Sequence, residues 1–205
     1  MSAPRLGDAA AAAALRAGSV LLLATDTVCG LHARADFPAA LARIADLKGR
    51  PQGKPLLVLA ESLAQARSLC RPLSVAQAAL CAAAWPGPFT FLLPARAGLE
   101  PALVDPQPGT VAVRVPGRED LRRLIGLAGG PLASTSANPS GEPPLTILAD
   151  AVAAFGHGLA GWWEGDPGYD QGVGQPSALV DLTGDSPRIL RAGPLPLPPP
   201  GPAVS

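Results

Sequence analysis

The hydrophobic pattern changes repeatedly between an extended and a helical period along the chain. Apolar runs that are continuous or alternate with period two predict strands, and apolar positions spaced by three and four predict helices. Strands are expected at residues 19–24, 55–60, within 85–94, at 110–116, from 131, at 177–182 and at 188–191. Helices are expected between 8 and 18 and at 38–48, 63–70, 75–85, 119–127 and 147–155. This mixture of strands and helices predicts an α/β domain.

Local signals mark several boundaries of these elements. Asp8, Ser74 and Thr146 precede helical patterns and are expected to be N-caps, because their side-chain oxygens can accept hydrogen bonds from the first helical turn. The Gly-rich stretch 156–174 follows neither period and is expected to be one long irregular segment that could act as a lid. We expect the domain to span residues 1–193, followed by a tail at 194–205 with polyproline II character outside the core.

Composition restricts the classes of partner. Of the 205 residues 48% are hydrophobic, and 16 basic residues balance 16 acidic ones, so no broad basic surface is available for nucleic acid. Cys29, Cys70 and Cys81 are widely spaced and form no C-x-x-C pair, which argues against a zinc or disulfide framework and favours the cytoplasm. No long apolar run or signal-peptide pattern is present, and no membrane association is expected. Any anion site must therefore be local.

A short basic turn is the first candidate for such a site. Lys48, Arg50 and Lys54 lie between an apolar helical pattern and the strand at 55–60, and two glycines and two prolines restrict the backbone around them. Three cations on a stiff turn suit a polyphosphate. The alternative is that they complement the helix dipole and are merely solvated.

Two further polar stretches follow predicted strands. Hydroxyls and a carboxylate at 25–31 follow the strand at 19–24, and a dense set of hydroxyls and an amide occupies 134–141. Open α/β sheets place ligands at such strand ends. The alternative is a turn or surface loop whose side chains satisfy their own backbone.

Arg114 lies within an alternating strand, on the face opposite three valines. It could clamp a carboxylate through two parallel hydrogen bonds, or it could simply belong to an exposed sheet face. His32 and His157 are isolated in sequence, and neither is interpreted as a metal ligand or general base.

Six motifs together resemble the YrdC/Sua5 family. They run in order from about residue 20 to 193, so that the match is specific although each motif alone is weak. The motifs are Thr25-Asp-Thr-Val-Cys-Gly-Leu31, Lys48-Gly-Arg-Pro with Lys54-Pro-Leu56, Trp85-Pro-Gly-Pro-Phe-Thr90, Val111-Ala-Val-Arg-Val-Pro116, Ser134-Thr-Ser-Ala-Asn-Pro-Ser-Gly141, and Pro176-Ser177 with Ile189-Leu-Arg-Ala-Gly193.

The resemblance implies a twisted mixed α/β sheet of YrdC type, with flanking helices and a large concave cleft. It also implies synthesis of threonylcarbamoyl-AMP and pyrophosphate from L-threonine, bicarbonate or CO2, and ATP with Mg2+, as a step toward threonylcarbamoyladenosine (t6A) in tRNA. No metal site on the protein itself is expected. Other tRNA-modification proteins are expected partners, with weak contact to tRNA possible. Two alternatives are a non-catalytic double-stranded RNA or tRNA binder of the same fold, and a carbamoyl-transfer domain like those of hydrogenase-maturation proteins.

The resemblance also assigns residues. Lys48 and Arg50 are implied in catalysis by neutralising the phosphates. The implied ATP-binding set is Arg50, Lys54, Thr110, Asn138, Thr146 and Arg191, and the implied threonine-binding set is Thr27, Arg114, Ser136 and Ser177.

The chain departs from the family pattern at several places. Ala24 stands where a proline is usual, Cys29 where an aromatic residue is common, and Leu59 where longer members often carry a histidine. One threonine contact is therefore expected to be missing or supplied differently. The proline-rich stretch stands where Sua5-type proteins carry an additional domain, and the short, single-domain type is expected.

Overall fold

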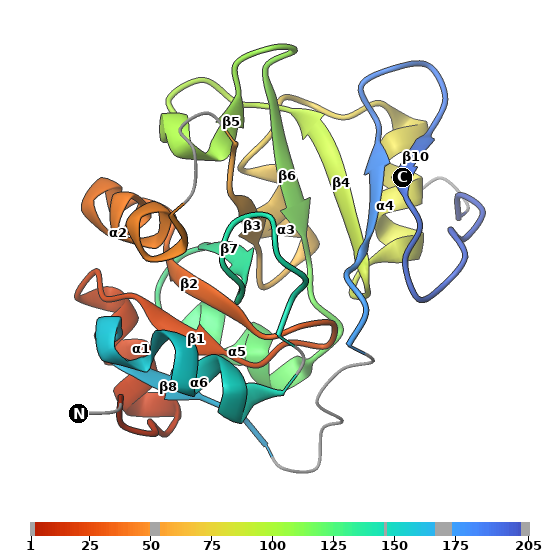
Figure 1. Ribbon diagram of the computed structural model, residues 1–205. Helices are drawn as coiled ribbons and strands as arrows, with labels where there is room; N and C mark the ends of the chain where they lie inside the picture. Colours follow the sequence, from red (N-terminus) through yellow and green to blue (C-terminus); the bar gives the residue numbers. More distant parts are fainter. Residues whose placement is uncertain (1–2, 50–53, 146, 167–173, 202–205) are drawn as a thin grey trace.

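One mixed β-sheet organises the structure, which is a computed structural model. It describes residues 3–49, 54–145, 147–166 and 174–201. Within these ranges the sheet has ten strands in the order β10-β9-β4-β6-β3-β7-β2-β1-β8, with β5 paired to β6 beside this path. In Figure 1, β8 lies at the lower left near the N-terminus and β10 at the right. The predicted α/β fold is confirmed.

The strands are short and combine both directions. Their bounds are β1 (Leu21–Leu23), β2 (Gly30–Arg34), β3 (Leu57–Leu59), β4 (Phe89–Pro94), β5 (Val104–Asp105), β6 (Thr110–Arg114), β7 (Leu132–Ser136), β8 (Gly161–Trp163), β9 (Ala178–Asp181) and β10 (Arg188–Arg191). The pairs β1–β8, β3–β6 and β4–β9 are parallel, whereas β1–β2, β2–β7, β3–β7 and β4–β6 are antiparallel.

Helices cover the two faces of this sheet unequally. Their bounds are α1 (Asp8–Arg16), α2 (Pro38–Lys48), α3 (Leu63–Arg67), α4 (Val75–Ala84), α5 (Glu119–Leu127) and α6 (Leu148–Phe155), with 3-10 turns η1 (Pro101–Leu103) and η2 (Gly156–Gly158). Side chains of α2, α3, α4 and α6 pack on one face, where Val58, Phe91 and Val113 form the centre of a large apolar cluster. On the other face, α1 and α5 pack against Leu21 and Leu23.

The second face is only partly covered. The apolar cluster beneath α1 and α5 contains no residue of β4, β6, β9 or β10. On the uncovered part, Leu92, Ala112 and Leu179 are half-buried, while Val111 and Val113 of β6 point to the opposite face and are fully buried. This face of the sheet is therefore partly exposed beside the region that α1 and α5 cover. The alternating pattern of residues 110–116 is compatible with one buried and one partly exposed face.

Local chemistry explains the best-predicted helices. Pro38 occupies the first turn of α2, and Gly49 ends the helix with φ +56°, a left-handed conformation that glycine adopts without penalty. Ser74 caps α4: its Oγ accepts from the backbone amide of Gln77, and the Gln77 side-chain oxygen accepts from the backbone amide of Ser74, which completes a capping box. The predicted bounds of α2 and α5 coincide with the observed ones.

Two predicted caps are wrong. Gly7, not Asp8, is the N-cap of α1, and the Asp8 carboxylate instead accepts a hydrogen bond from Trp163 Nε1 at 2.9 Å. Ile147 is the N-cap of α6, and Thr146 lies outside the described residues. Asp8 thus ties α1 to β8, a long-range contact that the local pattern could not reveal.

Three strands, β2, β5 and β8, were not predicted, and one residue of the stretch expected outside the core packs against it. β2 follows the polar stretch at 25–29 directly, and β8 lies within the region expected to be irregular. Leu197 of the proline-rich stretch packs against the main apolar cluster, and with Pro198 and Pro200 it borders a cavity beside Ser74 and Leu80. None of the helices in the described ranges has the length and apolar content that a membrane span requires.

Candidate active site

Lys48 connects the end of α2 to the loop after β7. Its side chain is buried, and Nζ donates hydrogen bonds to Asn138 Oδ1 at 3.0 Å and to the backbone oxygen of Ser136. The backbone oxygen of Lys48 in turn accepts from the amide of Ser140 at 3.0 Å. Lys48 is therefore not a solvated helix-end cation, and its charge lies beside a predicted nucleotide-binding residue.

Asn138 is held on both sides of its amide group. Ser136 Oγ donates to Asn138 Oδ1 at 2.5 Å, and Asn138 Nδ2 donates to the backbone oxygens of Pro139 at 2.9 Å and Glu142 at 2.6 Å. Since Lys48 and Ser136 both donate to Oδ1, the orientation of the amide follows from its partners. This network brings together three predicted site residues and fixes their positions.

The β1–β2 loop satisfies part of its own backbone, as the alternative interpretation required. Thr25 Oγ1 donates to the backbone oxygen of Val28 at 2.6 Å and accepts from the amide of Thr27 at 3.2 Å. The backbone oxygen of Cys29 accepts from the amide of Ala137 at 3.0 Å, so this loop lies against the start of the loop after β7.

Cys29 itself has a structural contact. Its Sγ donates to the backbone oxygen of Leu145 at 3.0 Å, and burial raises the pKa of the Cys29 thiol to about 11. The thiol therefore stays protonated near neutral pH and is a poor nucleophile.

Arg114 is buried, so the alternative that it belongs to an exposed sheet face is wrong. Its side chain is 3% exposed; Nη1 donates to Thr27 Oγ1 at 2.7 Å, and Nε donates to the backbone oxygen of Gly87 at 3.2 Å. Nη2 forms an ion pair with Asp26 Oδ1. Asp26 Oδ2 accepts from the amide of Gly117 at 2.8 Å. Two predicted threonine-site residues thus meet here, together with a carboxylate to which the sequence analysis gave no role.

A third group joins β9 and β10 to the same region. Ser177 Oγ and Thr90 Oγ1 lie 2.8 Å apart, and Arg191 donates from Nε at 3.1 Å and Nη2 at 3.0 Å to the backbone oxygen of Ser177. Burial, and to a smaller extent the positive charge of Arg114, lowers the pKa of Arg191. The buried Arg114 and the solvent-exposed Arg191 therefore influence one another electrostatically, which makes this part of the sheet favourable for an anion.

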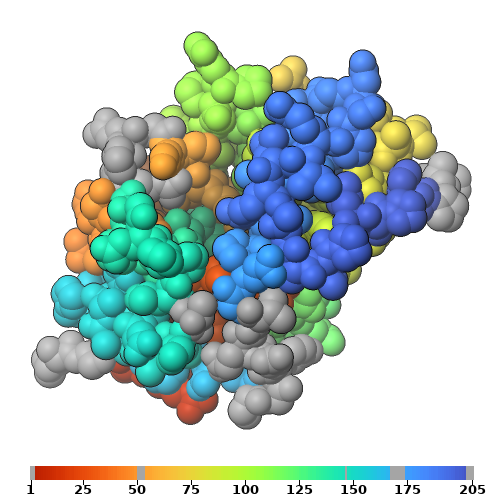
Figure 2. All heavy atoms as spheres, turned by 45° about the vertical axis from the view of Figure 1, so that its right-hand side comes forward, coloured from red at the N-terminus to blue at the C-terminus, as the bar shows by residue number. Residues whose placement is uncertain are grey.

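Other predicted site residues lie apart from these groups or outside the description. Thr110 is buried at the start of β6, about 13 Å along the strand from Arg114. Lys54 is exposed, and Arg50 and Thr146 lie outside the described residues. In Figure 2 the surface is hollowed between the teal region that contains the loop after β7 and the blue region that contains β9 and β10, with orange-red atoms of early residues between them.

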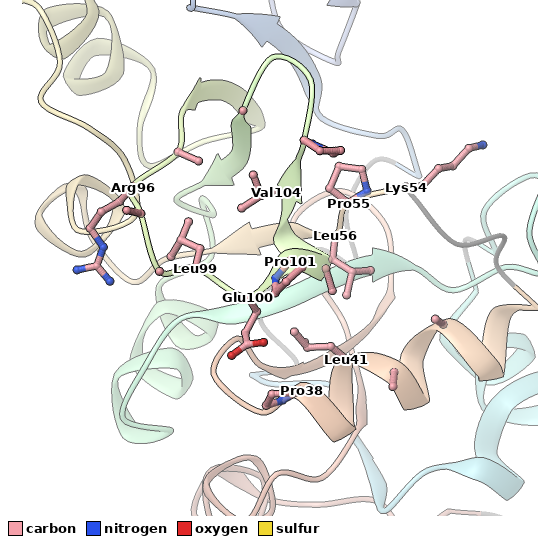
Figure 3. A pocket seen from close by; sticks show the side chains of 18 of the residues that line it. Pro38, Leu41, Lys54, Pro55, Leu56, Arg96, Leu99, Glu100, Pro101 and Val104 are labelled. Carbon is pink, nitrogen blue, oxygen red and sulfur yellow. The ribbon is translucent and has the colours of Figure 1, made fainter.

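A cavity among the described residues lies elsewhere. It has a volume of about 1070 Å³ and lies between α2, Leu56 and the segment around η1. Lys54 is the predicted site residue among its described lining residues, and Figure 3 shows the Lys54 side chain extending away from Leu41, Leu56 and Val104. This apolar cavity is therefore not the polar site described above.

The described histidines do not contribute an acid or base to the polar site. His32 is fully buried in β2; Nδ1 donates to the backbone oxygen of Gly30 at 2.8 Å, so Nε2 accepts from Ser134 Oγ at 3.0 Å. The pKa of His32 is lowered to about 4, chiefly by burial; the hydrogen bond to Gly30 opposes this, and the charge of Arg114 adds a smaller lowering. His157 is exposed in η2. Within the described ranges, no three side chains of His, Cys, Asp or Glu lie together as a metal site.

Fold and site together define a mixed α/β protein in which Lys48 and Arg114 are buried and contact hydroxyl and amide groups. Residues 13–193 match the Sua5/YciO/YrdC family, whose domain is described as "Telomere recombination". The chain is 39% identical over 181 residues to a protein of Chromohalobacter salexigens named threonylcarbamoyl-AMP synthase, covering 88% of this chain and 94% of that protein. The chain belongs to the Sua5/YciO/YrdC family.

Solved structures agree with this assignment. The structure of P. abyssi Sua5 complexed with L-threonine has a TM-score of 0.83 and 34% identity, and the match covers 96% of this chain and 58% of that one. The chain thus spans little more than half of the P. abyssi protein. E. coli YciO has a TM-score of 0.82 at 22% identity, which covers 94% of this chain and 92% of that chain and supports the YrdC fold.

Proposed function

We propose that this chain is a threonylcarbamoyl-AMP synthase, that is, a nucleotidyltransferase that uses L-threonine, bicarbonate or CO2, and ATP. The observation that carries the proposal is the buried Arg114, which donates to Thr27 and acts electrostatically on Arg191, the hydrogen-bond partner of Ser177. An arginine held in this way suits an amino-acid carboxylate. The relative from C. salexigens bears the name of this enzyme, and P. abyssi Sua5 binds L-threonine.

The chemistry requires no protein nucleophile. The threonine amine adds to CO2 to give a carbamate and releases one proton. A carbamate oxygen then attacks the α-phosphorus of ATP, and the bond to the β,γ-phosphates breaks to release pyrophosphate. Catalysis would come from alignment of the two reactants and from positive charge that stabilises the phosphates, each of which can contribute several kcal/mol.

The proposed ATP site includes the basic turn and the Lys48–Asn138 network. Lys48, Arg50 and Lys54 would neutralise phosphate charge, and Lys48 would also keep Asn138 in position. Thr110, Thr146 and Arg191 complete the proposed nucleotide set. Mg2+ would arrive with ATP and be held by phosphate oxygens and water, a binding mode that needs few protein carboxylates.

The proposed threonine site consists of Thr27, Arg114, Ser136 and Ser177. Three of these side chains, Thr27, Arg114 and Ser177, are buried, and Arg114 donates a hydrogen bond to Thr27. Such rigid placement reduces the free energy needed to order the site when the amino acid binds.

The proposed product is an activated intermediate for tRNA. We expect other t6A-modification proteins to receive threonylcarbamoyl-AMP, with no more than weak contact between this chain and RNA. We also expect the reaction to take place in the cytoplasm, where ATP and tRNA are available.

Pyrophosphate release measured with purified protein tests the proposal. Wild-type protein should release pyrophosphate from ATP only when L-threonine and bicarbonate are both present, and Arg50→Ala or Lys54→Ala should abolish the release while the protein remains folded. Arg43→Ala, which changes an exposed arginine on α2, is the matched control and should leave the rate unchanged. Wild-type turnover in the Arg50 or Lys54 variant, or release that does not depend on threonine, would contradict the proposal. An RNA-binding protein without catalysis would release none.

A further inference from the structure

Asp26 is the one charged residue of the β1–β2 loop, and it lies directly against Arg114. Its side chain is 17% exposed, compared with 3% for Arg114, so that the carboxylate is the more accessible member of the ion pair. Gly117 brings its amide to Asp26 Oδ2 at 2.8 Å, and a Cβ at Gly117 would lie only 3.0 Å from that oxygen. The surrounding backbone is therefore shaped to hold this carboxylate beside the guanidinium.

The pair keeps hydrogen-bonding capacity for a ligand. Nη2 of Arg114 and Oδ1 of Asp26 are buried and contact one another, so these two atoms face each other and not a ligand. A guanidinium carries five N–H donors, and a carboxylate has about four acceptor positions. Within the described ranges, the contacts of Nη1 and of Asp26 Oδ2 are one hydrogen bond each, to Thr27 and from Gly117. A second N–H of Nη1 and a second acceptor position of Oδ2 are therefore the groups that a ligand could use.

We propose that Asp26 and Arg114 form a two-charge clamp for the amino acid, in which Arg114 takes the carboxylate and Asp26 accepts a hydrogen bond from the α-amino group. An α-amino acid carries its two charged groups on adjacent atoms, and a side-by-side cation and anion on the protein match that arrangement. The identification of this amino acid as threonine rests on the proposed function. Asp26 thereby becomes a substrate-binding residue that selects for the amine which must later become the carbamate.

Removal of the negative charge should affect amine recognition specifically. Asp26→Asn keeps the shape of the side chain and an acceptor for the Gly117 amide. A hydrogen bond to a charged group contributes about 1.5–3 kcal/mol, so the variant should raise the KM for L-threonine about 10- to 100-fold. The KM for ATP should change within about twofold, because the lost contact does not involve the nucleotide.

An analogue that lacks the amine separates binding from a structural role. The probe is 2,3-dihydroxybutanoate with the stereochemistry of L-threonine, which retains the carboxylate and the side-chain hydroxyl. If Asp26 binds the amine, the inhibition constant of this analogue should change within about twofold in Asp26→Asn while the threonine KM rises. If Asp26 merely positions Arg114, binding of threonine and of the analogue will weaken equally, and that result would overturn the clamp. An unchanged threonine KM would overturn it as well.

Two further measurements make the outcome clear. Asp36→Asn removes a carboxylate that also pairs with an arginine, Arg34, but lies on the surface with 60% of its side chain exposed, and it should leave both constants unchanged. Thermal unfolding of Asp26→Asn should remain cooperative, which shows that the variant is folded.

Titration of L-threonine alone, by calorimetry without ATP, separates the clamp from the proposed function. If threonine binds wild-type protein more tightly than Asp26→Asn but no pyrophosphate is ever released, the clamp stands and the proposed function fails. If pyrophosphate is released and Asp26→Asn binds threonine as wild type does, the clamp alone fails.

Discussion

The buried arginines of two arginine–aspartate pairs, Arg114 and Arg118, lie close together in the chain, but the two pairs have different surroundings. Arg118 and Asp120, at the start of α5, are 2% and 1% exposed, and the Arg118 guanidinium lies over the Trp163 ring. Asp120 accepts four hydrogen bonds, from Nε and Nη2 of Arg118 and from the amides of Leu121 and Asp166. In the pair of Arg114 and Asp26, the carboxylate accepts one backbone amide and is partly exposed.

The difference separates a structural pair from a binding pair. Burial alone would raise the pKa of Asp120, but hydrogen bonds from Arg118 and the backbone amide of Asp166 outweigh burial and lower it. A carboxylate whose acceptor positions are filled by the protein stabilises the fold and cannot take a ligand. A carboxylate that the protein leaves partly unfilled and partly exposed is available to one. The filled acceptor positions and the exposure of the carboxylate together distinguish the two pairs.

Replacing the aspartate of each pair by asparagine should produce the largest difference between the pairs, measured as the free energy of unfolding. Asp120→Asn leaves the Arg118 cation buried without its neutralising charge, and we expect the free energy of unfolding to fall by about 3–5 kcal/mol. Asp26→Asn, at the more exposed pair, should cost much less stability. Urea unfolding of both variants measures this, with threonine KM determined on folded protein. Equal destabilisation by the two substitutions would show that both pairs are structural.

His32, whose pKa is influenced by the charge of Arg114, should make the free energy of unfolding depend on pH. Its pKa of about 4 in the folded protein lies below the ordinary value of 6.5, so the unfolded chain binds the proton more readily. The contribution of neutral His32 to the free energy of unfolding should therefore be fully present above pH 6.5. It should be lost as the pH decreases toward 4, by about 3 kcal/mol in total. Urea unfolding at several pH values measures the loss.

A comparison with His32→Gln identifies the group responsible. The variant should be less stable at pH 7, but its stability should change less between pH 6.5 and 4 than that of wild type. The same slope in both proteins would assign the pH dependence to other groups.

Truncation of Arg114 should affect one substrate. Arg114→Ala removes the donor for the carboxylate and leaves Asp26 without its counter-ion, so we expect kcat/KM for threonine to fall about 100-fold. Steady-state assays with each substrate varied in turn should show a much smaller change for ATP. Arg118→Ala is the matched control, and it should lower Tm without a selective change in the threonine KM. An unchanged threonine KM in Arg114→Ala would remove Arg114 from the site.

The smallest expected effect calibrates the stability measurements. Ser74→Ala removes the N-cap of α4, away from both ion pairs, and should cost about 1 kcal/mol and lower Tm by about 2–4 °C. Differential scanning fluorimetry is sufficient to detect this, and threonine KM should not change. A change in threonine KM would show that loss of stability alone disturbs the site.

The elements that were predicted correctly are those whose ends are set by local chemistry. The bounds of α2 follow from Pro38 and Gly49, and the cap of α4 from Ser74, all of which act within one helical turn. β2 and β8 were missed because both are defined by pairing with β1, from different parts of the chain. Pairing between distant segments leaves little trace in a short stretch of sequence.

The sequence predicted which residues belong to the candidate site better than it predicted the role of each residue. The alternation around Arg114 placed it opposite the valines but could not decide between an exposed and a buried face, because burial depends on the β1–β2 loop that covers it. Asp26 received no role because a carboxylate in a turn usually satisfies its own backbone. Only the coordinates show that it meets Arg114 instead, 88 residues further along the chain.

A crystal structure of this chain with L-threonine tests the central claim most directly. The account predicts the threonine carboxylate within hydrogen-bond distance of the Arg114 guanidinium and the amino nitrogen within hydrogen-bond distance of an Asp26 carboxylate oxygen. Threonine bound with its amino group directed away from Asp26, or bound elsewhere with the ion pair of Asp26 and Arg114 untouched, would contradict it.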